Sequence, residues 1–595
     1  MDPRGAQTEK PGLPLPVVAA AVAAIVIATM LIAARGRLST TLGDTDDAMR
    51  LVIVRALMSG ENGWFHQHLL RLQPPRGLDM HWSRLLDGGI AGMMRLFRLV
   101  LPPERAEAAT RLVWPLAWTL PAIWAALAMA RRLGGKAAVL PAAGFLAVNI
   151  LLYVQWWPGR IDHHNVQIAL SLAALAGAVA GGLGGGLLAG AATGLGLAVG
   201  LEALPFLALA GVGVALRFLF DPQAQAGGAR AYAATLFAAT GAFYLAQTPP
   251  GRWGASVCDA LAANLWCAVM VAGAGLLATT ALTRTRSFAV RLAALAVTGG
   301  AAAAVYLALD PVCLHGPLAA VDPHLKPIWM DHITEMAPLV GKFWSKRSNF
   351  VVCTLVLSAL GAASWLWLGM HKDRRTPGWL ILGAALALAF ATALGAERMA
   401  SYANWYAVPL IAAALGDLTV RYARGSLIPT ILITAAFSQP ALIYALDAVP
   451  GWAKPADKAK GGDAAERCIE TKAFARLAAL PTGLVLGEID LGPRILAQTP
   501  HSVVAAPYHR MAWGILAAHH ALSAAPGEDE RAARALGAAY VVTCPARVRQ
   551  LNHTGLGPRS LQIRLDHGQP PAWLQRLSAP AEPLQVYRVQ PPPGG

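Results

Sequence analysis

Long apolar runs alternate with short polar segments over the first three quarters of the chain, up to about residue 446. Most of these runs approach the roughly 20 residues that an apolar helix needs to cross a bilayer. A region this rich in Ala, Leu and Gly is too apolar to fold in water. We therefore predict an α-helical polytopic membrane protein with about 13 spans, at residues 17–34, 112–130, 137–154, 166–180, 187–199, 203–219, 232–246, 258–282, 292–309, 350–369, 379–394, 402–415 and 427–446.

The pattern changes after a linker around residues 455–463. Short β-type runs there alternate with helix-like stretches, which is typical of a small α/β domain; they lie at 483–489, 502–506, 539–543 and 584–589. The prediction is a membrane domain at 1–450, with outer loops at 35–111 and 310–349, and an α/β domain at 451–595.

The net charge of +16 is largely explained by membrane topology. Arg and Lys gather in alternate connections between the predicted spans, which places those connections and the N-terminus in the cytoplasm. The first run, 17–34, is longer than a signal-peptide core and lacks a small-residue cleavage site, so we predict a retained span. Because no Lys/Arg cluster has interleaved aromatic residues, we expect no nucleic-acid partner.

The outer side then carries four polar clusters. The first is Asp44, Asp46 and Asp47, directly after the first span. Three carboxylates in four residues suit a hard divalent cation, which prefers oxygen ligands and can neutralise a phosphate leaving group. An acidic helix cap at the membrane surface would produce the same pattern, so both interpretations stay open.

The second cluster is Asp162, His163 and His164 in a turn between two spans. In an extended turn, alternate residues point the same way, so Asp162 and His164 can meet at one metal ion. A histidine in such a turn is also compatible with a purely interfacial role. A charged pair beside a span is nevertheless costly, which favours a function.

The third cluster contains Glu335 in the segment His-Ile-Thr-Glu, and the fourth contains Arg398 beside Glu397. Taken alone, Glu335 would be read as part of a solvated loop. An arginine is suited to bidentate recognition of phosphate. Every one of these clusters falls on the side opposite the basic connections.

In this order, the clusters resemble the motifs of the oligosaccharyltransferase catalytic subunits, a family of GT-C membrane glycosyltransferases. Asp46 with the downstream Arg50 resembles the first motif of that family, and the Gly-Arg-Ile-Asp-His-His run ending at His164 resembles its D-x-(D/E/H) motif. The His-Ile-Thr-Glu segment resembles its TIXE motif, and Arg398 its phosphate-binding arginine. The run 77–85 resembles an amphipathic stretch of its first loop.

The resemblance implies a GT-C fold with 13 spans and an outward C-terminal domain. It also implies an inverting, metal-dependent transfer of a sugar or glycan from a polyprenyl phosphate or diphosphate carrier. On this hypothesis Asp46, Asp162 and His164 bind Mn²⁺ or Mg²⁺ against the donor phosphate, and Glu335 joins them when its loop closes.

Two further roles complete the predicted donor side of the site. Arg398 and His163 would hold the donor phosphate. Asp46 or Asp47 would take the proton from the acceptor nucleophile as the catalytic base. The membrane lipid itself would carry the donor to this site.

The sequence departs from the family where the sequon-reading WWDYG motif is expected. The best match is Glu-Ile-Asp-Leu-Gly at 488–492, which lacks both tryptophans and the tyrosine. The acceptor is therefore open, and a lipid, a polysaccharide or a peptide each fits. Asp490, Tyr508, His509 and Arg510 are candidate acceptor-side residues, although a structural role explains them equally well.

Two rival functions use similar residues. A transporter would bury its charges near the midplane and show repeated halves, and no such repeat is visible. A lipid-linked glycan flippase or polymerase would be expected to work without the metal-binding set, so metal dependence separates it from a transferase.

The cysteines and the composition bear on the compartment. No CxxC or Cys/His spacing typical of zinc sites occurs. Cys468 and Cys544 share the predicted outward domain, where a disulfide and two free thiols are both open. The Ala/Gly/Arg-rich composition suits a bacterium of high genomic GC content, which predicts the inner membrane with a periplasmic C-terminal domain.

Overall fold

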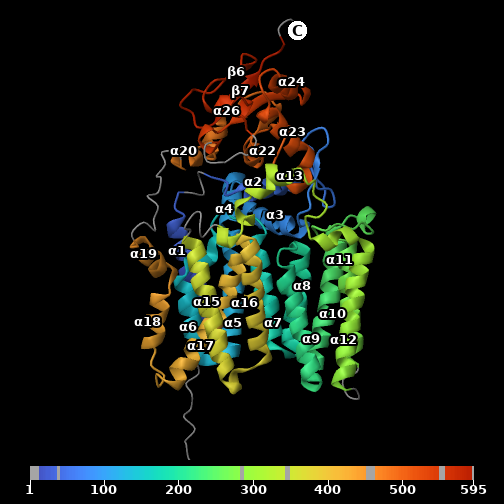
Figure 1. Ribbon diagram of the computed structural model, residues 1–595, viewed down its shortest axis with the longest axis vertical. Coiled ribbons are helices and arrows are strands. Elements are labelled where there is room, and N and C mark those ends of the chain that lie inside the picture. Colours follow the sequence, from blue (N-terminus) through green and yellow to red (C-terminus); the bar gives the residue numbers. More distant parts are fainter. Residues whose placement is uncertain are drawn as a thin grey trace, which may run out of the picture.

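The computed structural model describes residues 13–36, 41–281, 287–341, 349–449, 462–548 and 556–592, with side chains at 465–546 in the fifth segment. A bundle of long helices forms one end of the molecule, and the C-terminal domain forms the other (Figure 1). Between them lies a layer of loops and short helices built mainly from residues that follow α1 and α12. This outer layer positions the site.

Helices cover most of every apolar run that the sequence predicts. Seven described helices are long and apolar enough to cross a membrane, or nine if two bent pairs each count as one span. The protein is thus a membrane protein, whereas the count of 13 spans stays a prediction. The bundle comprises α1 (Leu15–Ala33), α4 (Pro103–Ala117), α5 (Thr119–Gly134), α6 (Val139–Val148), α7 (His164–Ala180), α8 (Gly182–Val199), α9 (Leu204–Phe220), α10 (Pro222–Gln247), α11 (Ala263–Thr280), α12 (Phe288–Leu309), α15 (Asn349–Met370), α16 (Pro377–Gly395), α17 (Ala400–Arg421), α18 (Ile428–Ala436) and α19 (Gln439–Asp447).

Glycines let α8 pack against α10 at very short range. A Cβ atom at Gly186 would lie 2.0 Å from the carbonyl oxygen of Gly228, and one at Gly190 would lie 2.5 Å from that of Tyr232. Without a hydrophobic driving force between helices in lipid, such close backbone approach is a main source of helix association. The Gly-rich stretch is therefore a packing surface.

Two helix breaks support each other inside the bundle. The α6 helix bends by 65° into the 3-10 segment Ile150–Trp156, and α18 bends by 49° into α19. The Asn149 side-chain oxygen accepts from the Gln439 backbone N–H at 2.6 Å, and the Gln439 side-chain oxygen accepts from the Leu151 backbone N–H at 2.8 Å. Backbone groups freed by a break must be satisfied within the protein in lipid, and this reciprocal pair does so.

The C-terminal domain is built around a five-stranded sheet of order β4-β3-β5-β7-β6. The first three strands are parallel, while β7 pairs antiparallel with both β5 and β6. Each predicted β-type run contains one strand, and β6 has no counterpart among those runs. The strands are β3 (Leu484–Gly487), β4 (Ser502–Val503), β5 (Ala538–Thr543), β6 (Leu574–Arg576) and β7 (Gln585–Val589), accompanied by α22 (Gly492–Gln498), α23 (Ala512–Ser523), α24 (Glu528–Ala535) and α26 (Leu561–Asp566).

The outer layer is bonded to the edge of that sheet. Leu72 forms a parallel bridge with Val503 of the edge strand β4. The Gln73 N–H donates to the Val503 carbonyl at 2.9 Å, and the Val503 N–H donates to the Arg71 carbonyl at 2.9 Å. The Arg71 guanidinium also donates to the carbonyls of Thr499 and His501. This edge is thereby closed, and the domain is fixed to the first outer loop.

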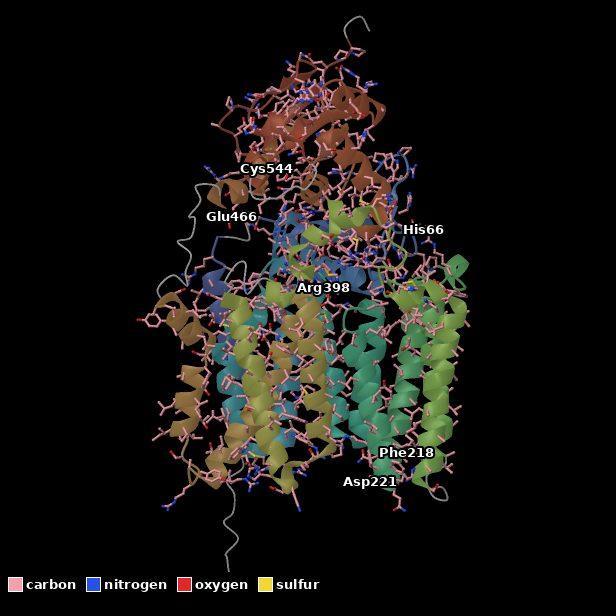
Figure 2. All side chains as sticks on the ribbon, viewed as in Figure 1. His66, Phe218, Asp221, Arg398, Glu466 and Cys544 are labelled. Carbon is pink, nitrogen blue, oxygen red and sulfur yellow. A yellow bond between two sulfur atoms is a disulfide. The ribbon has the colours of Figure 1, made fainter. Side chains whose placement is uncertain are left out.

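Two disulfides lie outside the helix bundle, one in the C-terminal domain and one in the outer layer. Cys468 pairs with Cys544, so the disulfide is the alternative that the structure contains (Figure 2 labels Cys544). Cys258 pairs with Cys313 and joins the segments before α11 and after α12, a pairing that the sequence reasoning missed. Disulfides of this kind persist mainly in oxidising compartments.

Candidate functional site

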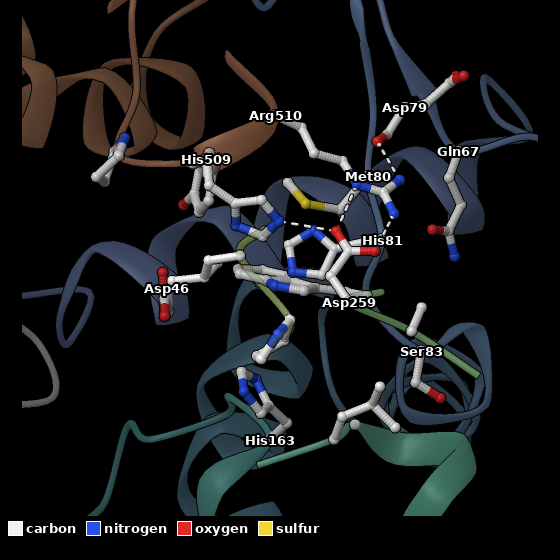
Figure 3. Close-up of a pocket in the computed structure, with 18 of the residues that line it drawn as sticks. Asp46, Gln67, Asp79, Met80, His81, Ser83, His163, Asp259, His509 and Arg510 are labelled. Carbon is white, nitrogen blue, oxygen red and sulfur yellow. Dashed lines mark hydrogen bonds and ion pairs between the residues drawn. The ribbon is translucent and has the colours of Figure 1, made fainter. Parts of the chain in front are cut away.

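A cavity of about 1480 Å³ lies between the helix bundle and the C-terminal domain. Residues from segments that are far apart in the chain line this cavity. Figure 3 shows part of the cavity. The predicted residues Asp46, His163, His164, Glu335, Arg398, Asp490, Tyr508, His509 and Arg510 all line it. The structure therefore gathers the polar clusters of the sequence around one space.

The first acidic cluster forms a helix cap, which is one of its two interpretations. Asp44 is the N-cap of α2 (Thr45–Ser59), and its Oδ1 accepts from the backbone N–H groups of Asp46 and Asp47, each at 3.0 Å. The Asp47 Oδ2 accepts in return from the Asp44 N–H at 3.0 Å, which completes a capping box. Asp44 and Asp47 thus cap the helix, and Asp44 and Asp46 both line the cavity.

Asp47 also joins α2 to the second cluster. Its Oδ1 accepts from the backbone N–H of Ile161 at 2.7 Å and from that of Asp162 at 3.1 Å. The side chain is fully buried. Asp47 therefore holds the turn before α7 in place with both carboxylate oxygens, a positioning contact that the sequence did not predict.

Arg160 lies among three carboxylates behind the cavity wall. Its guanidinium pairs with Asp44, reaches the Asp162 carboxylate at 2.6 Å and approaches the Asp47 carboxylate at 3.7 Å. Ligand atoms of Asp44, Asp47 and Asp162 lie within 4.8 Å of one another, which is close enough to share a metal ion. In this arrangement the arginine supplies the compensating positive charge.

A second group within reach of one ion consists of His163, His164 and Glu202. The His164 Nδ1 lies 3.0 Å from the Glu202 carboxylate, and the Arg398 Nε lies 3.8 Å from it. Burial alone would raise the pKa of Glu202. The positive charges of His164 and Arg398 nevertheless hold this pKa well below its usual range. The sequence analysis did not predict Glu202. A single carboxylate between two apolar runs is energetically costly beside a membrane, and this cost is the signal that could have identified it.

Arg398 connects this group to the third cluster. Its Nη1 lies 3.6 Å from the Glu335 carboxylate, which belongs to the short 3-10 turn Thr334–Met336. The arginine side chain is 29% exposed and the Glu335 side chain 42% exposed, so both can meet a ligand in the cavity. The Glu397 N–H donates to the Ala337 carbonyl at 3.0 Å and holds this loop against the start of α17.

The predicted metal set is gathered only in part. The His164 backbone N–H donates to the Asp162 carboxylate at 3.1 Å, and Asp162 is fully buried just behind the wall on which Asp46 and His164 lie. Burial, reinforced by the charges of Asp44 and Asp162, raises the pKa of Asp46 to about 8. Carboxylates crowded in this way ionise together when a divalent cation joins them, so the donor set fits such an ion.

All four candidate acceptor-side residues line the cavity. Tyr508, His509 and Arg510 also contact other segments of the chain. The Tyr508 hydroxyl donates to the Thr45 carbonyl at 3.4 Å, and the Tyr508 ring packs edge-on against Trp82. His509 and Arg510 both pair with Asp259, at 2.8 and 2.5 Å. Tyr508 thus anchors the C-terminal domain to the outer layer.

The comparisons with known proteins add a structural result. No protein-family model matches the sequence, and no curated protein is significantly similar to it in sequence. The structure, by contrast, matches the oligosaccharyltransferase AglB of Archaeoglobus fulgidus with an inhibitory peptide and a dolichol-phosphate, at a TM-score of 0.61 and 14% identity, over 96% of this chain and 74% of that one. The chain has an oligosaccharyltransferase-like GT-C fold.

Two further structures, both of the Archaeoglobus fulgidus oligosaccharyltransferase, agree at this level. The one tethered with an acceptor peptide containing the NVT sequon has a TM-score of 0.56 and 14% identity, over 97% of this chain and 74% of that one. The one in complex with Zn and sulfate has the same TM-score and identity, over 97% and 73%. The fold that the motif order implied is confirmed.

Proposed function

We propose that the protein is a membrane glycosyltransferase that moves a sugar or glycan from a polyprenyl phosphate or diphosphate carrier to an acceptor on the outer face of the membrane. The observation that supports this most is the meeting of all four polar clusters at one cavity, between an apolar bundle and a polar domain. A dolichol-phosphate and an acceptor peptide are named with the Archaeoglobus fulgidus oligosaccharyltransferase structures, which share the fold.

Asp46, Asp162 and His164 would hold Mn²⁺ or Mg²⁺, and Glu335 would join them on closure of its loop. Glu202 and His163 are the adjoining groups in reach of His164. When bound, the ion would neutralise the negative charge that develops on the departing phosphate. Support comes from the crowded carboxylates around Asp46 and from the oligosaccharyltransferase structure that holds Zn.

The chain's own residues would perform the remaining steps. Arg398 with His163 would bind the donor phosphate at the membrane edge of the cavity. The acceptor nucleophile would attack the anomeric carbon, the bond to the phosphate oxygen would break with its electron pair on the phosphate, and Asp46 would take the acceptor proton. Asp47 is suited to positioning because backbone donors engage both of its oxygens.

We further propose a bacterial inner-membrane location, with a cytoplasmic N-terminus and the C-terminal domain in the periplasm. The basic connections of the sequence and the two disulfides outside the helix bundle support the same orientation. The acceptor would be a lipid, a polysaccharide or a peptide, and no nucleic acid takes part.

The test is donor consumption by the purified protein. A polyprenyl-linked sugar is incubated with the protein and Mn²⁺, with a set of candidate acceptors, and the carrier is followed by mass spectrometry. We expect consumption that chelation abolishes and that Asp46→Ala and Asp162→Ala both lose. Asp331→Ala, in the exposed part of the same outer layer, is the matched control. Equal consumption in all variants would refute the proposed site.

A further inference from the structure

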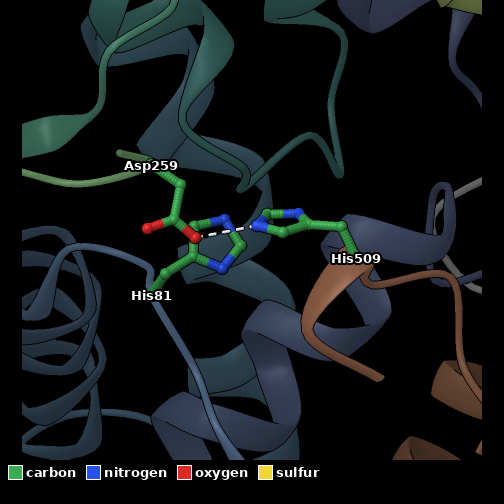
Figure 4. Close-up of side chains that lie close together, drawn as sticks. All are labelled: His81, Asp259 and His509. Carbon is green, nitrogen blue, oxygen red and sulfur yellow. Dashed lines mark hydrogen bonds and ion pairs between the residues drawn. The ribbon is translucent and has the colours of Figure 1, made fainter. Parts of the chain in front are cut away.

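A second cluster of ligand-type side chains lies in the cavity wall, apart from the acidic clusters. It consists of His81 in the first outer loop, Asp259 in the connection between α10 and α11, and His509 at the start of a 3-10 turn in the C-terminal domain. One ligand atom from each lies within 4.8 Å of the others. Figure 4 shows the three side chains converging from three separate segments.

We propose that His81, Asp259 and His509 form a second divalent-cation site, which takes a borderline ion of the Zn²⁺ type. Two imidazoles and one carboxylate, without thiolates, are a recurrent ligand set for zinc with an open fourth position. All three residues line the cavity, so water or a polar group of a substrate can reach that position. This site is independent of the proposed transferase function.

The state of the side chains supports a ligand here. The His81 Nδ1 is buried and has no hydrogen-bond partner among the residues that the structure describes, and such a group is costly unless a ligand satisfies it. The His81 and His509 rings are 4.5 Å apart between centroids. The His509 Nε2 lies 2.8 Å from the Asp259 Oδ2, so imidazole nitrogen and carboxylate already face each other.

Arg510 holds the carboxylate from outside. Its Nε donates to the Asp259 Oδ2 at 2.7 Å, and its Nη2 donates to the Oδ1 at 2.5 Å. Outer partners of this kind orient a ligating carboxylate. Arg510 also makes the ligand group neutral overall, and the three neutral histidines of carbonic anhydrase show that zinc binds to a neutral set.

An ion at this point would tie three segments together. Asp259 follows Cys258 of the Cys258–Cys313 disulfide, so its backbone is already fixed to the loop after α12. Through His81 and His509 the ion would add a bond between the first outer loop and the C-terminal domain. Because a site of this kind does not exist in the unfolded chain, binding should stabilise the folded state.

The experiment measures zinc and thermal stability on the purified full-length protein. After chelation, the protein is equilibrated with Zn²⁺, freed of unbound metal and analysed by elemental mass spectrometry. We expect wild type to retain about one equivalent more than His81→Ala or His509→Gln, with an affinity loss of about tenfold or more in each variant. Zn²⁺ should raise the melting temperature of wild type more than that of these variants.

Three controls make the result decisive. His509→Gln keeps a donor for Asp259, so its melting temperature without metal should match wild type even if His81→Ala folds poorly. His520→Ala changes an exposed histidine of α23 and should bind as wild type does. Asp162→Ala should lose donor consumption yet keep the Zn²⁺ stabilisation. Equal zinc content and equal thermal response in wild type and His509→Gln would overturn the site.

Discussion

The two neighbouring carboxylates Asp46 and Asp47 should respond in opposite ways to the same change. Asp47→Asn changes a carboxyl group that accepts from three backbone N–H groups, at 2.7 to 3.1 Å. The amide keeps one acceptor oxygen and turns a donor toward the Asp44 N–H. A lost hydrogen bond costs about 0.5–1.5 kcal/mol, and the unsatisfied donor adds about 1–3 kcal/mol. We expect a loss of about 3 kcal/mol in stability.

Asp46→Asn should leave stability unchanged or slightly higher. Burial and the charges of Asp44 and Asp162 already oppose its ionised form, as the raised pKa shows. The uncharged amide therefore removes a repulsion. Asp46 is, however, the proposed catalytic base and a proposed metal ligand. Asp46→Asn should therefore lower the rate of transfer by about 10²–10⁴-fold.

The assay combines thermal unfolding in detergent, followed by tryptophan fluorescence, with donor consumption at saturating Mn²⁺. Asp46→Asn should lose activity at an unchanged melting temperature, and Asp47→Asn should lower the melting temperature. A variant Asp47→Asn with wild-type stability and no activity would refute the assignment of Asp47 as a positioning residue. Full activity in Asp46→Asn would refute the base.

Three further changes test other parts of the structure. Glu202→Gln should weaken donor use through a higher KM, measured by titrating the polyprenyl-linked sugar, because a carboxylate that orients the phosphate-binding side chains becomes neutral. Cys258→Ser opens a disulfide that closes a separation of 55 residues and should cost about 4 kcal/mol, measured as a lower melting temperature, whereas Cys267→Ser, at a free cysteine, should cost little. Gly186→Ala should lower the melting temperature because its Cβ would meet a backbone carbonyl of α10 at 2.0 Å, whereas Gly184→Ala meets nothing within 4 Å and should be neutral.

The sequence was most informative where local pattern decides structure. Apolar runs become helices because a segment in lipid must satisfy its own backbone, so composition alone locates them. The order of the short motifs was enough to predict the fold. The polar residues at 44–47, 162–164, 335 and 398 are energetically costly beside a membrane, so they stand out from the apolar runs around them. The bends of 65° and 49° could not be predicted, since they depend on the reciprocal contact of Asn149 with Gln439 across the bundle.

Contacts between distant segments escaped the sequence for the same reason. Glu202, His81 and Asp259 each stand alone in the chain, and only packing brings them beside His164 or His509. The pairing of Cys258 with Cys313 likewise depends on α11 and α12 lying side by side (Figure 1). The capping role of Asp44 and Asp47, by contrast, was one of two interpretations that the local pattern allowed.

The two ends of the cavity differ in how closely they follow the motifs of the oligosaccharyltransferase catalytic subunits that the sequence resembles. At the membrane end, Arg398, Glu335 and His164 keep the residue types of the motifs and lie in the wall of one cavity. At the other end, the run 488–492 has no indole to stack on a peptide, and the Glu488 Oε1 accepts from the Cys544 N–H at 3.1 Å beside a disulfide. Part of the run that would read a sequon therefore stabilises the domain itself. The proposed transferase function, with the donor side as in the motif family and a different acceptor, would account for both observations.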